Sequence, residues 1–221
     1  MIQRMRALTT FTMLTAMGLV PLSGRAAAQA RGGNCVAIGT PKPSVEYNYR
    51  LTDSRGTSND FTTVWDEITP TASRSRTTRG RSRIEYVSRY RIVDDVSVIE
   101  QTVQGDAGTT TFAPGVVGDP FGRACTGRSW PIASATATNR SARGAFSAQS
   151  DAGEMKMLGI HVSVTVPAGT FDTIHYTRTT RSAARGAIVD EYWKSIEHGV
   201  VVKHLSAMAG VKLTEELQSI R

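Results

Sequence analysis

The sequence predicts an all-β fold, with a single antiparallel domain of about nine or ten strands that follows a removed leader. Three observations lead to this prediction. Apolar and polar residues alternate with a period of two over several segments, clusters of Gly, Pro, Asn and Asp separate these segments, and no amphipathic helix of useful length occurs. A curved sheet or half-barrel fits this pattern, and a sandwich is the alternative.

The first 30 residues are predicted to be the leader. Arg4 and Arg6 precede the uncharged stretch 7–22, and small residues run up to Ala30. A positive start, a short apolar core and a small-residue end are typical of a secretory signal peptide. We expect cleavage after Ala30, with Ala28 as the second choice and an uncleaved anchor as the alternative. The mature protein is then expected in the periplasm or outside the cell.

The mature chain divides into a lead-in and one domain. Residues 31–43 are rich in Gly and Pro and are expected to be flexible, and the β domain is expected over residues 44–221. Residues 114–131 are expected to form a connection rich in Gly and Pro. Residues 132–150 are expected to form a loop or a weak strand. The strands expected before this connection are 45–51, 61–68, 82–92, 96–104 and 109–112.

The C-terminal third has the clearest alternation. Ile160, Val162, Val164 and Val166 alternate with polar residues, which predicts a half-buried strand. A short helix that starts at Thr214 is the alternative for the last segment. The strands expected in this third are 158–166, 171–182, 188–194, 200–206 and 211–220.

The two cysteines, Cys35 and Cys125, both remain in the mature chain. In an oxidising compartment two cysteines most simply form one disulfide, and no CxxC spacing indicates a redox or metal pair. This bridge would close a loop of about 90 residues, which stabilises a fold by roughly 4 to 5 kcal/mol in the loop-entropy estimate.

The full chain has a net charge of +7, and its arginines are concentrated between residues 74 and 91. Five of them share odd parity, so on one extended strand they would project from one face. Such a stripe suits an anionic membrane surface or an acidic envelope partner, and a solvated outer face is the alternative. Nucleic acid is not an expected partner, because no aromatic residues interleave with the basic ones. The stripe consists of Arg79, Arg81, Arg83, Arg89 and Arg91.

Three segments of the C-terminal third carry a resemblance. Residues 164–173 read VTVPAGTFDT, residues 191–193 read EYW and residues 199–203 read GVVVK. This order resembles a pattern shared by uncharacterised exported bacterial β-proteins, some of which are similar in fold to the lipoprotein-localisation (Lol) carriers of the periplasm. The resemblance covers residues 158–220 and implies a curved half-barrel that shelters acyl chains. Lol carriers plug this half-barrel with helices, whereas no helix is expected here.

The same block has a structural explanation that needs no ligand. Pro167 presets a turn, Gly169 permits a positive φ, and Tyr192 and Trp193 are large residues that suit a core.

No catalytic residue, metal ligand or cofactor site is predicted. The serines lie in no G-x-S-x-G or S-x-x-K motif, and neighbouring acids such as Asp190 and Glu191 point to opposite faces of a strand. His161 and His175 flank a turn almost symmetrically, and with Glu191 or His204 they form the best zinc candidate. No HxH or HxxxH spacing supports such a site.

The preferred function is non-enzymatic. We expect the chain to bind a hydrophobic or amphipathic ligand, such as a lipid or acyl chain, or a partner in the cell envelope. One alternative is an envelope hydrolase with a dispersed site, and another is a scaffold or adhesion module that acts through its basic face. The residues expected to line a ligand cavity are Trp65, Trp130, Tyr192 and Trp193, and a place in the hydrophobic core is the alternative for each.

Overall fold

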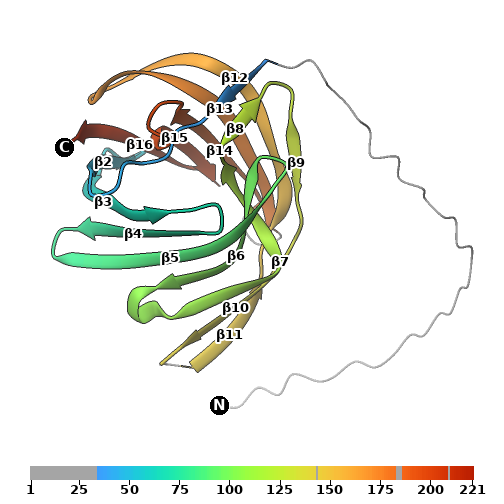
Figure 1. The fold of residues 1–221 in the computed structure, drawn as a ribbon. Helices are drawn as coiled ribbons and strands as arrows, with labels where there is room; N and C mark the ends of the chain where they lie inside the picture. Colours follow the sequence, from blue (N-terminus) through green and yellow to red (C-terminus); the bar gives the residue numbers. More distant parts are fainter. Residues whose placement is uncertain (1–33, 143, 183–185, 209) are drawn as a thin grey trace, which may run out of the picture. The chain divides into compact units, whose positions relative to one another are not determined.

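The computed structural model describes residues 34–142, 144–182, 186–208 and 210–221, which belong to one compact unit, Gly32–Arg221. The predicted signal peptide and its cleavage site lie outside these residues. The described part of the chain is all-β, as predicted, with sixteen strands and one 3-10 turn (Figure 1). The first elements are β1 (Cys35–Ala37), β2 (Glu46–Asp53), β3 (Ser58–Ile68), β4 (Ala72–Arg79), β5 (Ser82–Val93), β6 (Val96–Gln104), η1 (Gly105–Ala107), β7 (Thr109–Pro120) and β8 (Arg123–Cys125). The remaining strands are β9 (Ser129–Ile132), β10 (Thr136–Ser141), β11 (Gly144–Gln149), β12 (Ala152–Val166), β13 (Gly169–Ser182), β14 (Gly186–Ser195), β15 (Val201–Met208) and β16 (Val211–Ile220).

Fourteen of the described strands form one antiparallel sheet, in the order β11-β10-β7-β6-β5-β4-β3-β2-β16-β15-β14-β13-β12-β9. Most neighbours in the sheet are also neighbours in sequence, because short turns join them. The exception at the centre is the pairing of β2 with β16, which joins the first long strand to the last. Strands β1 and β8 form a separate two-stranded sheet.

The large sheet is curved and does not close on itself, because β11 and β9 remain as its two edges. Figure 1 shows the strands following one another around this curve, from β12 and β13 through β16 and β2 to β10 and β11. The short strand β8 contacts β12, and β9 contacts β7. The sheet has two arms, one formed by β2 to β7, β10 and β11 and the other by β9 and β12 to β16. The short strands β8 and β9 therefore connect the two arms.

Two hydrophobic clusters stabilise the fold. The first gathers at β9, β12 and β13 and includes the fully buried Ile174 and Tyr176. The second gathers around β2, β15 and β16, where Tyr47, Val202 and Leu217 are fully buried. The tip of the β12–β13 hairpin packs on this second cluster, and the amide of Ala168 donates to the carbonyl oxygen of Leu217 at 3.2 Å.

The alternation in the C-terminal third correctly predicts strands β12 to β16, and the last segment is a strand rather than a helix. The expected break at Asp94 and Asp95 is also confirmed. Both residues have positive φ values, 51° and 67°, which suit the tight turn between β5 and β6.

The expected number of strands was too low. Residues 109–120 form the long strand β7 instead of a short strand followed by a loop. The ladder between β6 and β7 is irregular where Pro114 and Gly115 lie, so the strand accommodates a residue that has no N–H donor. Residues 132–150 contribute β10, which is polar and mostly partly buried, and β11, which is exposed throughout, so neither shows a clear alternation. The segment expected to be a flexible lead-in contains β1, which the Cys35–Cys125 disulfide holds against β8.

Candidate functional site

A cavity of about 450 Å³ lies between the two arms of the curved sheet. Its walls come from β2 to β7 and β13 to β16, and from segments that precede or follow strands. Most lining side chains are apolar or aromatic, and four are charged. The apolar and aromatic side chains are Ile38, Pro41, Tyr49, Phe61, Trp65, Ile68, Tyr90, Ile99, Pro120, Phe121, Val200 and Val201.

Aromatic residues form one wall of the cavity. Tyr49 and Phe61 are direct partners on β2 and β3, and their rings stack with centroids 5.2 Å apart. The ring centroids of Tyr90 and Phe121 lie 5.9 Å apart. The Tyr90 hydroxyl donates to the carbonyl oxygen of Thr69 at 2.7 Å. These contacts fix the rings in place, so the wall is already formed without a ligand.

Two chain segments close one end of the cavity. Residues 38–41 follow β1, and residues 118–122 comprise the end of β7 and the two residues that join it to β8. The amide of Ile38 donates to the carbonyl oxygen of Gly122 at 2.9 Å, and the amide of Gly39 donates to the carbonyl oxygen of Ile196 at 2.7 Å. This closed end therefore rests on the turn between β14 and β15.

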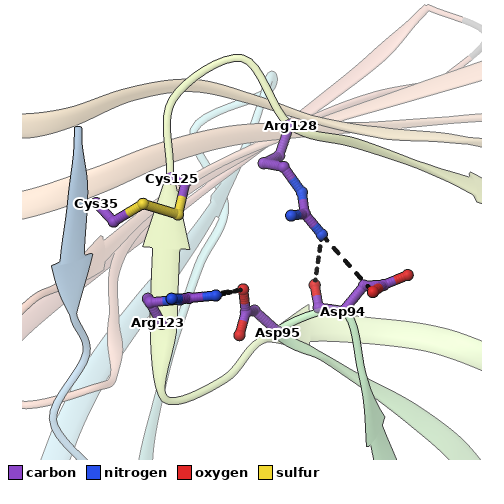
Figure 2. Close-up of a disulfide and its surroundings, with 6 residues drawn as sticks. All are labelled: Cys35, Asp94, Asp95, Arg123, Cys125 and Arg128. Carbon is purple, nitrogen blue, oxygen red and sulfur yellow. Dashed lines mark hydrogen bonds and ion pairs between the residues drawn. A yellow bond between two sulfur atoms is a disulfide. The ribbon is translucent and has the colours of Figure 1, made fainter. Parts of the chain in front are cut away.

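The predicted disulfide between Cys35 and Cys125 is confirmed, and it joins the strands β1 and β8 that continue into the closed end. Figure 2 shows two further ties beside the disulfide. Arg123 forms an ion pair with Asp95 at 3.0 Å, and Arg128 donates to the carbonyl oxygen of Asp94 at 3.3 Å. Strand β8 is thus attached both to β1 and to the β5–β6 turn.

The four charged residues in the cavity wall are Asp119, Arg178, Lys194 and Glu215. Lys194 is buried, and its ammonium group donates to the carbonyl oxygen of Pro120 at 2.9 Å. Burial lowers the pKa of Lys194, although Asp119 opposes this effect. Burial raises the pKa of Glu215, and this rise is opposed by His204 and by Arg79.

A row of rings runs across the strands next to the cavity. Tyr176, Tyr192 and His204 are successive partners on β13, β14 and β15, with stacking distances of 4.9 Å and 4.3 Å. The Tyr176 hydroxyl donates to Asp119 at 3.0 Å. His204 contacts Asp190 at 3.3 Å. Burial alone would raise the pKa of Asp190, but hydrogen bonds with His204 and Ser206 outweigh it and lower the pKa.

The histidines proposed for a zinc or hydrolase site do not converge. His175 contacts Glu191 at 2.6 Å and stacks on Trp193, whereas the alternation of β13 and β14 places Tyr176 and Tyr192 on the opposite face. His161 pairs with Asp172 in an exposed position. No group of three or more His, Cys, Asp or Glu residues in the described chain is arranged to hold a metal ion.

One of the four residues expected to line a ligand cavity does so. Trp65 lies in the cavity wall. Trp130 is buried in the first hydrophobic cluster, where its indole N–H donates to the carbonyl oxygen of Asp94 at 2.9 Å. Tyr192 belongs to the row of rings, and Trp193 packs against His175 and the second cluster. The last three residues thus occupy core positions, and a role in ligand binding for any of the four stays a prediction.

The expected arginine stripe is divided. Arg79 ends β4 and lies over the Phe61 ring at 5.6 Å, and Arg81 lies in the turn before β5. Arg83, Arg89 and Arg91 remain on β5 and share one face. The chain turns at Gly80, which has a φ of +56°, so the five side chains do not lie on a single strand.

Sequence reasoning missed most of the cavity, including Tyr49, Phe61, Lys194 and Glu215. A partial signal was present on β14, where Lys194 has the same parity as Tyr192. A lysine on the inward parity of a predicted strand marks a buried charge that needs a partner.

The described residues define an open, curved antiparallel sheet with a hollow inner face. No helix among them is long and apolar enough to cross a membrane. No family model matches the chain, and no curated protein matches it in sequence.

Among solved structures, the chain is similar to a crystal structure from Bacteroides fragilis described as a "putative exported protein with YmcC-like fold". The TM-score is 0.50 with 10% sequence identity, over 85% of this chain and 100% of that chain. At this identity the likeness concerns the fold alone, and the similarity to Lol carriers stays a prediction.

Proposed function

We propose that the mature protein is an exported, non-enzymatic binding protein that holds an apolar or amphipathic ligand inside its curved sheet. The observation that carries this proposal is the cavity of about 450 Å³ with its mainly apolar and aromatic wall. Ligand cavities of proteins commonly measure about 300 to 1,000 Å³ and combine an apolar lining with a few polar groups.

Three features support an extracytoplasmic location. The first 30 residues have the pattern of a signal peptide. Cys35 and Cys125 form a disulfide, a bond that persists in oxidising compartments. The structurally similar protein from Bacteroides fragilis is itself described as exported.

The arrangement of titratable groups gives less support to a hydrolase. A hydrolytic site needs a nucleophile or water, a base and a stabilising donor that converge on one substrate atom. His175 with Glu191 and His204 with Asp190 lie on opposite faces of the sheet. We therefore infer a binding function rather than a hydrolytic one.

Titration with an environment-sensitive apolar dye and native mass spectrometry of protein purified from periplasm test the proposal. A Ser88→Leu variant fills the cavity from β5. Ser82→Leu makes the same change at an exposed position of β5 that does not line the cavity.

We expect dye affinity to fall at least about tenfold in Ser88→Leu and to stay unchanged in Ser82→Leu, because a tenfold loss corresponds to about 1.4 kcal/mol of lost contact. Equal affinity in both variants, or a protein that binds no apolar compound, would contradict the proposal.

A further inference from the structure

Lys194 is an unusual residue for the wall of an apolar cavity. It lies on β14 between its cross-strand partners Ile174 and Val201, and it is 8% exposed. Lysine is almost never buried to this degree unless its charge is paired. The position of Lys194 therefore needs an explanation that packing does not supply.

The ammonium group of Lys194 has spare donor capacity. A lysine has three N–H donors, and one of them reaches the carbonyl oxygen of Pro120 at 2.9 Å. Among the described residues, no carboxylate lies within ion-pair distance of Lys194 and no second acceptor contacts its Nζ atom. A buried cation that has one hydrogen bond and no ion pair is costly, and the lowered pKa of Lys194 agrees with this.

Asp119 raises the pKa of Lys194, but it lies beyond ion-pair distance and so offsets the charge of Lys194 only in part. Asp119 accepts the hydrogen bond of the Tyr176 hydroxyl at 3.0 Å. The raised pKa of Glu215 favours the neutral form of that side chain. Arg178 adds a second cation to the wall. The wall thus holds two cationic side chains, Arg178 and Lys194, that an anionic ligand can contact.

The place of Lys194 in the cavity indicates how a ligand would lie. Its contact with Pro120 puts it at the closed end, beside Val200 and Val201, while the aromatic wall of Tyr49 and Phe61 belongs to the opposite arm. A charged group at one end and an apolar surface beyond it match an amphiphile. A volume of about 450 Å³ lies in the lower part of the usual range for ligand cavities, which favours a small amphiphile with one acyl chain.

We propose that Lys194 binds the anionic head group of a single-chain amphiphile, a carboxylate or a phosphate, at the closed end of this cavity. The inference rests on the proposed binding function and adds the chemical class of the ligand. Lys194 then pairs its charge with the head group, and the acyl chain replaces water against the aromatic wall.

The test measures the affinities of the mature protein for dodecanoate, dodecyl phosphate and dodecanol, which share one chain and differ in the head group. Lys194→Met removes the charge and keeps an unbranched apolar side chain. Lys156→Met is the matched control, because Lys156 lies on β12 in an exposed position outside the cavity wall.

We expect the wild type and Lys156→Met to bind at least one anionic compound at least tenfold more tightly than dodecanol. The compound preferred, dodecanoate or dodecyl phosphate, identifies the head group. In Lys194→Met we expect the preference to disappear while the affinity for dodecanol is unchanged.

Equal binding of anionic and neutral compounds by the wild type overturns the role of Lys194 and leaves the binding function intact, and this result needs no variant to fold. A preference that persists in Lys194→Met overturns the same role. Failure of all three compounds to bind overturns the binding function and the head-group site together.

Discussion

Gly39 and Gly199 pack directly against each other at the closed end of the cavity. A Cβ atom built on Gly199 would overlap the carbonyl oxygen of Gly39, and one built on Gly39 would overlap the carbonyl oxygen of Glu197. Gly199 also has a φ of +62°, in the left-handed region that favours glycine. The β14–β15 turn and the segment after β1 can therefore approach this closely only without side chains.

This contact predicts that Gly199→Ala lowers the stability of the fold. The strain of a left-handed alanine costs about 1 to 2 kcal/mol, and the overlap with Gly39 adds to it. Gly56→Ala is the matched control, because Gly56 has a φ of +82° but no atom within 4 Å of an added Cβ. Urea unfolding should show a clearly larger loss for Gly199→Ala, and equal losses would mean that the close packing is unimportant.

The disulfide should contribute a large part of the stability of the domain. Cys35 and Cys125 are 90 residues apart in sequence, and the loop-entropy estimate for that separation is about 4 to 5 kcal/mol. We expect the free energy of unfolding to fall by a similar amount when both cysteines are replaced by alanine.

Urea unfolding of the double variant measures this loss, and reduced wild-type protein provides the comparison. The reductant should leave the double variant unchanged, since its effect must act through this bond. A double variant as stable as the oxidised wild type would show that β1 and β8 are held by their other contacts.

Glu215 should make the stability depend on pH. Burial raises its pKa above the ordinary value of 4.5, while His204 and Arg79 oppose the rise and Tyr49 lies beside it. The folded state therefore keeps a proton on Glu215 after the unfolded state has lost it. Stability is lost as the pH rises from the unfolded pKa through the folded one.

The neutral variant Glu215→Gln should be more stable than the wild type at pH 7, and this advantage should vanish below the unfolded pKa of about 4.3. The neighbouring change Glu216→Gln is the control, since Glu216 forms an ion pair with Lys203 at 3.0 Å. It should not stabilise the protein at neutral pH. If Glu215→Gln raised the free energy of unfolding equally at pH 7 and below the unfolded pKa, the titration of Glu215 would be excluded as the cause.

The sequence predicts strands correctly where apolar and polar residues alternate regularly. It misses strands whose composition shows no such alternation. Strands β12 to β16 carry regular Val, Ile and Leu residues, so their period is visible. Strand β7 contains Pro114 and Gly115, and β11 is exposed throughout, so neither shows a half-buried pattern. The disulfide could be predicted from the expected compartment and the number of cysteines alone.

The cavity could not be predicted in the same way. Its wall combines β2 and β3 with β14 and β16, which meet because the sheet curves and β2 pairs with β16. Periodicity identifies which residues share a face but not which strands oppose each other across a hollow. The sequence therefore does not distinguish Trp65, which lies in the cavity wall, from Trp130, which lies in the first hydrophobic cluster.

Contact between the arginine stripe and an anionic membrane stays a prediction, and ion pairs already compensate part of the charge on β4 and β5. Arg74 pairs with Glu85, Arg76 with Asp66 and Arg91 with Glu100. Among the described residues, Arg83 and Arg89 of β5 have no such acidic partner and are exposed. These two arginines therefore present the uncompensated charge of this strand.

We expect the double change Arg83→Ser and Arg89→Ser to weaken binding to phosphatidylserine vesicles at low salt by roughly 30-fold, from about 1 kcal/mol for each arginine. The single change Arg91→Ser is the comparison, because it removes an arginine whose charge Glu100 already offsets and leaves that carboxylate unpaired. Vesicle sedimentation at two salt concentrations measures both variants, because screening must reduce a true surface attraction. Binding that is unaffected by the double change or by salt would indicate that this face is a solvated surface.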